Sequence, residues 1–449
     1  MTAVSAAGND SWTATQRRIL ALAWPIIISN ITVPLLGLVD TAVLGHLPDA
    51  SHLAAVALGS QLFTLLFWSF GFLRMGTTAL VVQASGRSDE QQVLQVLQRA
   101  LWLTLPLVPL LLLLALALWP LLLPLMGGTA ALQQEALSYL HIRLLATPAV
   151  LVQYSLIGWF IGQGKPRLPL LMLVTANGIN ALLDIWFVFG LGMTSDGVAA
   201  ATAIADYSAA LLGLWLAYRQ GLRGLGRRPA WASMAATIKV NQHLFVRTLC
   251  LLAVFAFFTA QGARQGELIL ATNAMLITLL LLISNALDGF AHAAETITGQ
   301  ALGAGRPRQM RRGIWASGVS SLLLAVLLSM GFWYAGPWLL QQLTDNEALQ
   351  SSLATYQVFL FWLPLVGCLS YWLDGVLVGA SATAWMRNAM LASALLCFLP
   401  LWWWLQPMGN QGLWLAFYGF LLCRGGLMLW PMWQILRYPQ RFTESCSRS

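Results

Sequence analysis

The chain has 449 residues, of which 58% are hydrophobic and only 9% are charged, and its mean hydropathy is +0.71. A soluble globular domain carries about 25% charged residues, so this composition excludes an ordinary soluble enzyme. The high hydrophobicity also excludes a disordered chain. The formal net charge of +8 is attributed to arginines in membrane-flanking loops rather than to nucleic-acid binding. The sequence therefore predicts an all-α polytopic membrane protein.

Apolar runs long enough to cross a bilayer, about 20 residues each, recur along the chain. The first is too long for the apolar region of a cleavable signal and is expected to stay in the mature protein. We expect twelve membrane-spanning helices, at 19–44, 53–81, 98–125, 136–159, 168–191, 197–218, 244–263, 268–300, 313–340, 353–379, 388–406 and 412–436. The longest interval outside them predicts an N-terminal lobe at 1–218, a cytoplasmic linker at 219–243 and a C-terminal lobe at 244–449.

Basic residues are concentrated in one set of the predicted loops. Of the 24 lysines and arginines, 20 are assigned there, including Arg247 near the start of the seventh span. The opposite loops carry mainly acids. Because cytoplasmic loops are enriched in lysine and arginine, both termini are expected to be cytoplasmic.

The two halves of the sequence resemble each other. The segment QASG at 83–86 is matched by QALG at 300–303, and Gly158 and Gly162 are matched by Gly375 and Gly379, all at an offset of 217. Six plus six spans in the same orientation imply a two-fold axis along the membrane normal, as is common in transporters. A channel or a structural membrane protein would not need this duplication. Since there is also no Walker lysine motif, the sequence predicts a secondary transporter and not an enzyme.

Acids within the predicted spans are the candidate functional residues, because a charge near the bilayer midplane costs at least about 2.5–3.5 kcal/mol. There are more such acids than arginines, so some must be protonated, bind a cation or face water, as an ion-coupled carrier requires. No role follows from the sequence for His292. The candidates for a polar cavity are Asp206, Asp288, Glu295, Asp374, Asn177 and Arg74, and Arg143 and Arg424 are further cations within spans.

Asp40 lies late in the first span, which also contains Pro25 and Pro34. Proline removes a helix hydrogen bond and permits a kink. A helix with two prolines and a buried acid can bend when that acid changes charge. The alternative is a carboxylate that caps a broken helix.

A second polar group is expected in the fifth and sixth spans. Asn177, Asn180 and Asp184 are spaced i, i+3, i+7 and share one helix face, and Thr202 and Asp206 are spaced i, i+4. If these faces meet Asp40, they form an oxygen-rich site for a proton or a hard cation such as Na⁺. The alternative is hydrogen bonding between helices without an ion.

Several segments resemble the multidrug and toxic compound extrusion (MATE) family, and its DinF branch in particular. The most specific is NITVPLLGLVDTAVLGHL at 30–47, supported by FLRMGTT at 72–78, LDIW at 183–186, ALDGF at 286–290 and YWLDG at 371–375. The resemblance spans essentially the whole chain. It implies two six-helix lobes around a V-shaped cavity, and antiport in which cations enter while organic compounds leave.

The resemblance implies a monomeric multidrug exporter of the bacterial inner membrane, without a bound cofactor, that carries amphiphilic or cationic small molecules. It implies H⁺ or Na⁺ as the coupling ion and places the cation-coupling site at Asp40, Asn180, Asp184 and Thr202. Where some relatives carry a glutamate in span seven, this chain has Phe257, Phe258 and Gln261, which favours H⁺ through the N-terminal half. A flippase for lipid-linked precursors, from the same superfamily, is the alternative and would need a basic cavity.

Overall fold

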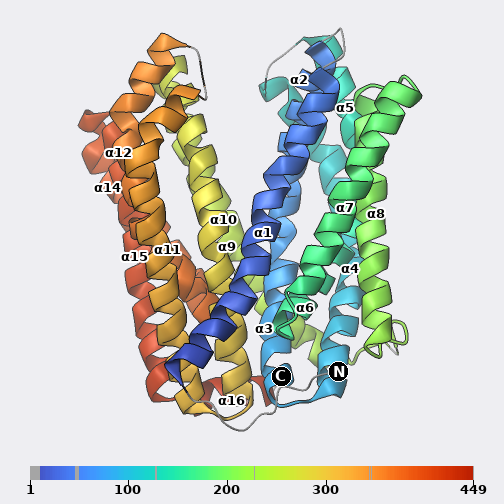
Figure 1. Ribbon diagram of the computed structural model, residues 1–449, viewed down its shortest axis with the longest axis vertical. Coiled ribbons are helices and arrows are strands. Elements are labelled where there is room, and N and C mark those ends of the chain that lie inside the picture. Colours follow the sequence, from blue (N-terminus) through green and yellow to red (C-terminus); the bar gives the residue numbers. More distant parts are fainter. Residues whose placement is uncertain are drawn as a thin grey trace. The chain divides into compact units, whose positions relative to one another are not determined.

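The computed structural model describes residues 11–45, 50–126, 129–226, 228–342, 344 and 346–447. Within these ranges, the side chains of residues 31–45, 50, 125 and 444–447 lie outside the description. The described residues form helices joined by short turns, and they contain no β-strand (Figure 1). The all-α fold predicted from the composition is therefore confirmed.

Eight helices come from the first half of the chain. They are α1 (Trp12–Gly45), α2 (Ala50–Trp68), α3 (Phe72–Gly86), α4 (Glu90–Leu125), α5 (Ala130–Leu144), α6 (Thr147–Gly162), α7 (Arg167–Ile185) and α8 (Ser195–Arg219). The second half forms α9 (Trp231–Arg264), α10 (Glu267–Gly303), α11 (Pro307–Gln342), α12 (Glu347–Gly379), α13 (Thr383–Ala392), α14 (Leu399–Leu405), α15 (Asn410–Arg437) and α16 (Gln440–Ser447). α9 begins at Trp231, so helix extends into the predicted linker.

Eleven of the twelve predicted spans coincide with helices that are long and apolar enough to cross a membrane. Ten are single helices or continuous helix runs, and the fourth predicted span is the bent pair α5 and α6. The first predicted span belongs to α1 and lies partly outside the described residues. The fifth and eleventh spans each contain a wide π-helical turn, at Trp186–Gly190 and Ser393–Phe398. The chain is thus a polytopic membrane protein.

The fourth span is broken, whereas the sequence predicted one helix at 136–159. α5 and α6 meet at an angle of 54°. Pro148 has no N–H to donate to the carbonyl of Leu144 four residues earlier. The Thr147 hydroxyl donates to that carbonyl instead, at 2.6 Å. Proline near the start of α6 therefore ends the α5 hydrogen-bond ladder, and a side chain satisfies the exposed carbonyl.

The described residues divide into two compact units. The first unit contains the residues up to 27, residues 82–88 and residues 242–449, and the second contains residues 28–81 and 89–241. α1, α3 and α9 therefore contribute to both units. In the first unit, Ile19 and Ala23 of α1 pack against Phe290 and Ile297 of α10. The lobe boundaries at 218 and 244 stay a prediction.

The repeated glycines allow close helix contacts within each unit. A Cβ atom at Gly158 of α6 would lie 2.3 Å from the Arg74 carbonyl oxygen of α3. A Cβ atom at Gly375 of α12 would lie 2.0 Å from the Ala291 carbonyl oxygen of α10. Both distances are too short for any residue larger than glycine, because backbone atoms cannot give way as a side chain can. The offset of 217 residues thus marks equivalent helix crossings.

The QASG and QALG segments contact each other. α3 ends at Gly86, where a Cβ atom would lie 2.1 Å from the carbonyl oxygen of Gln300. α10 ends at Gly303, where a Cβ atom would lie 2.0 Å from the carbonyl oxygen of Gln83. The glutamine of each motif thus faces the glycine of the other. This reciprocal contact lies within the first unit, because residues 82–88 belong to it.

Candidate functional site

A buried polar group in the second unit joins α7 and α8. Asn180 Nδ2 donates to Thr202 Oγ1 at 3.1 Å, and the Thr202 hydroxyl donates to the Val198 carbonyl at 2.8 Å. Asn180 and Asp184 are both fully buried. Among the described residues, Asn180 Oδ1 has no hydrogen-bond partner. The polar faces of α7 and α8 therefore contact each other at positions 180 and 202.

The helix geometry around this group is unusual. Asn177 lies half-buried one turn before Asn180, as the i, i+3, i+7 spacing predicts. One residue after Asp184, α7 passes into the π-helical turn Trp186–Gly190. Wide π turns inside α-helices are frequent at functional sites. The sequence did not indicate this turn.

Asp40 and Pro34 lie outside the residues whose side chains are described. The backbone at both positions belongs to α1, which runs as one α-helix from Trp12 to Gly45. Pro25, the other predicted kink residue, is buried in the same helix. The place of Asp40 in the cation-coupling site therefore stays a prediction.

Asp206 is held by an arginine. Arg143 of α5 donates from Nη1 to Asp206 Oδ2 at 2.8 Å, and the Arg143 guanidinium lies 4.2 Å from the centre of the Phe63 ring. Gln153 Nε2 of α6 donates to the Asp206 carbonyl at 2.9 Å. Asp206 is therefore neutralised by a charge partner and joins α5, α6 and α8. Arg74 is half-buried in α3, and its carbonyl accepts the Thr78 hydroxyl at 2.9 Å.

Asp374 of α12 is held by two arginines in the first unit. Arg247 of α9 and Arg424 of α15 both donate from Nη2 to Asp374 Oδ2. All three residues are at least nine-tenths buried. The assignment of Arg247 to a cytoplasmic loop was wrong: it lies within α9 and is only 9% exposed. Arg247 was counted among the loop arginines because its position near the start of a predicted span gave no sign that it is buried.

The Glu295 carboxyl group of α10 lies within hydrogen-bond distance of a histidine. His292 Nδ1 lies 2.8 Å from Glu295 Oε2, and the two side chains belong to consecutive turns of the helix. Glu295 is 2% exposed and His292 is 9% exposed. The i, i+3 spacing would have shown this pairing in the sequence, where His292 was left without a role. Asp288 lies half-buried on the same helix.

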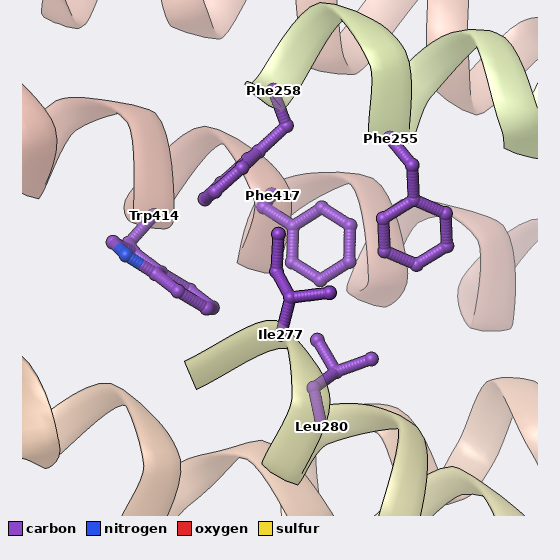
Figure 2. A pocket seen from close by; sticks show the side chains of 6 residues that line it. All are labelled: Phe255, Phe258, Ile277, Leu280, Trp414 and Phe417. Carbon is purple, nitrogen blue, oxygen red and sulfur yellow. The ribbon is translucent and has the colours of Figure 1, made fainter. Parts of the chain in front are cut away.

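Aromatic side chains surround the place in α9 where some relatives were expected to carry a glutamate. Phe257 packs against Phe398 and Trp402, with ring centroids 5.6 and 4.9 Å apart. Phe258 is 1% exposed and meets Trp414 edge to face at 5.0 Å. Figure 2 shows the small apolar pocket beside it, lined by Phe255, Phe258, Ile277, Leu280, Trp414 and Phe417. The side chains that line this pocket are all apolar.

A buried pair of side-chain amides lies next to Trp414 of this pocket. Neither amide was predicted from the sequence as a candidate site residue. Asn273 of α10 and Asn410 of α15 exchange two hydrogen bonds, of 2.7 and 2.9 Å. Trp414 Nε1 also donates to Asn273 Oδ1 at 3.0 Å. Each amide thus satisfies the other in an apolar core, which joins α10 to α15. The described residues contain no group of three or more His, Cys, Asp and Glu side chains that could hold a metal ion.

The comparisons with known proteins agree with this architecture. The sequence model of the MatE family matches residues 25–186 and 244–404. The chain is 38% identical over 431 residues to the DNA damage-inducible protein F of Escherichia coli K12, which covers 94% of this chain and 93% of that protein. It is 32% identical over 195 residues to a probable multidrug resistance protein NorM of Acinetobacter baylyi, covering 42% of this chain and 43% of that protein.

Solved structures show the same fold. The eukaryotic MATE transporter AtDTX14 aligns with a TM-score of 0.86, and the Vibrio cholerae MATE transporter VcmN in its bent form aligns with a TM-score of 0.83. Each is 18% identical to this chain and covers 97% of it, and each is matched over 100% of its own length. The family resemblance seen in the five sequence segments is confirmed by the family model and by the relative that matches 94% of the chain. The chain belongs to the MatE family, and it is a membrane transporter rather than an enzyme.

Proposed function

We propose that the protein is a multidrug efflux antiporter of the bacterial inner membrane, with both termini in the cytoplasm. It exchanges H⁺ for amphiphilic or cationic organic compounds, and Na⁺ is the alternative coupling ion. The similarity to proteins named for multidrug resistance supports the direction and the cargo. The similarity over most of the chain to DNA damage-inducible protein F supports placement in the DinF branch.

The observation that carries this proposal is the burial of Asp184 beside Asn180 and Thr202. Asp184 is fully buried in a span whose length and hydropathy fit a membrane crossing. Acids at such positions are rare and mark ion pathways, because their charge is costly in an apolar medium. The neighbouring amide and hydroxyl offer further oxygen atoms for a proton carrier or a small cation.

The acids with arginine partners are poor candidates for the coupling ion. Asp206 and Asp374 are each bonded to arginine, so a coupling cation would have to displace a guanidinium that each carboxylate already holds. The coupling role is proposed for Asp184 together with Asp40, as the family resemblance implies.

The test is transport of a fluorescent lipophilic cation into or out of proteoliposomes under a proton gradient or a Na⁺ gradient. A proton moving down a potential gains about 2.3 kcal/mol per 100 mV. We expect proton-driven transport by the wild-type protein and at least a tenfold loss in Asp184→Asn and in Asp40→Asn. Glu90→Gln is the matched control, because Glu90 is exposed in the first turn of α4.

Each other outcome changes the proposal. Transport driven by Na⁺ alone would move the coupling ion from H⁺ to Na⁺. Full proton-driven transport by Asp184→Asn would remove the coupling role of that acid. Absence of transport under both gradients would contradict the cationic cargo and favour the flippase.

A further inference from the structure

The end of α15 carries a row of aromatic and basic side chains. Trp430, Trp433 and Arg437 are spaced i, i+3, i+7 and share one face of the helix. The rings of Trp430 and Trp433 stack at 5.1 Å, and the two residues are 54% and 40% exposed. The Arg437 guanidinium lies 5.1 Å from the centre of the Trp433 ring and 5.5 Å from that of Tyr438. The row thus passes from an apolar part to a charged part over the last two turns of the span.

Two further arginines are held at the same place. The Arg441 guanidinium of α16 lies 4.8 Å from the centre of the Tyr438 ring, which Arg437 also contacts. Arg311 of α11 donates from Nε and Nη2 to the carbonyl oxygen of Leu436, at 3.1 and 2.8 Å. The last carbonyls of a helix lack partners within the helix, so this contact satisfies one of them and fixes the guanidinium. Arginines from three helices therefore meet at the end of α15.

The three arginines lie in a strongly basic part of the first unit. All three are exposed. Residues 296–344 and 425–449 together contain seven arginines and a single acid, Glu444. One carboxylate neutralises at most one of the seven. Because like charges close together repel each other, this surface favours an anionic partner.

The same surface lies where a membrane-spanning helix reaches the edge of the bilayer. α15 fits a membrane crossing and ends at Arg437. Tryptophan and tyrosine are enriched at this level, because their rings are apolar and carry one polar group. Seven residues of helix, from 430 to 437, span about 10 Å, and each headgroup layer is about 5–7 Å thick. The row therefore reaches from the upper acyl chains of a lipid to its phosphate.

We propose that this surface binds one anionic phospholipid, such as phosphatidylglycerol. The phosphate accepts hydrogen bonds from Arg311, Arg437 and Arg441, since the planar guanidinium matches the geometry of phosphate oxygens. The glycerol and the upper acyl chains pack on Trp430 and Trp433. A zwitterionic lipid such as phosphatidylcholine brings its own positive group to the arginines and binds more weakly. The proposal depends on the membrane location of the chain and not on its transport activity.

Native mass spectrometry of the full-length protein in detergent tests the site by measuring the affinity for single lipid molecules. The wild-type protein is titrated with phosphatidylglycerol and with phosphatidylcholine of the same acyl chains. We expect phosphatidylglycerol to bind at least about tenfold more tightly, because each basic residue near the lipid contributes about fivefold. Equal affinities for the two lipids would overturn the proposal. This comparison needs no variant and therefore stands even if a variant fails to fold.

Two double variants separate this site from the general positive charge of the protein. Arg437→Gln/Arg441→Gln is expected to lower the affinity for phosphatidylglycerol at least about tenfold. Arg219→Gln/Arg223→Gln is the matched control, because those two guanidiniums lie 5.1 and 4.7 Å from exposed aromatic rings of α8. It removes the same charge from the same kind of contact, leaves the three arginines of the site in place, and is expected to leave the affinity nearly unchanged. Equal losses in the two variants would overturn the proposal.

Competition with inorganic phosphate distinguishes a lipid from a free anion. We expect millimolar phosphate to leave phosphatidylglycerol bound, because the lipid also contacts the two tryptophans. Trp430→Ala/Trp433→Ala should weaken binding of both lipids and keep the preference for phosphatidylglycerol, since the arginines remain. Displacement of the lipid by inorganic phosphate would show that the surface binds a free anion, and would overturn the assignment to a phospholipid.

Discussion

Replacing Asp374 with asparagine is expected to lower the free energy of unfolding by about 3–5 kcal/mol. The substitution keeps the shape of the side chain but removes the negative charge that Arg247 and Arg424 share. Arg424 is 2% exposed and Arg247 is 9% exposed, so water cannot replace the lost partner. Two buried guanidinium groups would then repel each other. Chemical unfolding in mixed micelles, followed by tryptophan fluorescence, measures the change.

The control for this prediction lies on the same helix. Glu347 is exposed in the first turn of α12, and Glu347→Gln should change the free energy of unfolding by less than about 0.5 kcal/mol. Equal stability of Asp374→Asn and the wild type would show that the two arginines do not depend on Asp374. Other contacts would then stabilise the charges of Arg247 and Arg424.

Replacing Gly303 with alanine is expected to lower the free energy of unfolding by about 1–3 kcal/mol, the range for overpacking of a dense core. The new methyl group would lie 2.0 Å from the carbonyl oxygen of Gln83. α3 and α10 would have to separate to accept it. Gly86→Ala should have a similar effect, because its methyl group would lie 2.1 Å from the carbonyl oxygen of Gln300.

Gly331 provides the matched control for these glycine variants. It lies within α11, and a Cβ atom there would meet no atom within 4 Å. Gly331→Ala should therefore be neutral or stabilise the protein by up to about 1 kcal/mol, since alanine favours helix over glycine. A loss of stability in Gly331→Ala as large as that in Gly303→Ala would argue against steric contact as the cause. The same unfolding measurement compares all three variants.

The amino-acid sequence by itself determined the class of fold and the positions of eleven of the spans. Long apolar runs must become helices in a bilayer, because every backbone polar group has to be satisfied within the segment. The offset between Gly158 and Gly375 also pointed to a duplicated structure, and both glycines lie at close helix crossings. The break between α5 and α6 was not predicted, although Pro148 was visible as its local cause.

Tertiary structure decided which buried acids have permanent charge partners. The sequence showed more acids than arginines in the spans. It did not show that Arg247 bonds to Asp374, which lies 127 residues further along the chain. It also left Asp206 among the cavity candidates, where Arg143 of another helix neutralises it. Helical spacing identifies neighbours on one helix, such as His292 and Glu295. Pairing between helices depends on how they pack, and the energy of a buried charge depends on that packing.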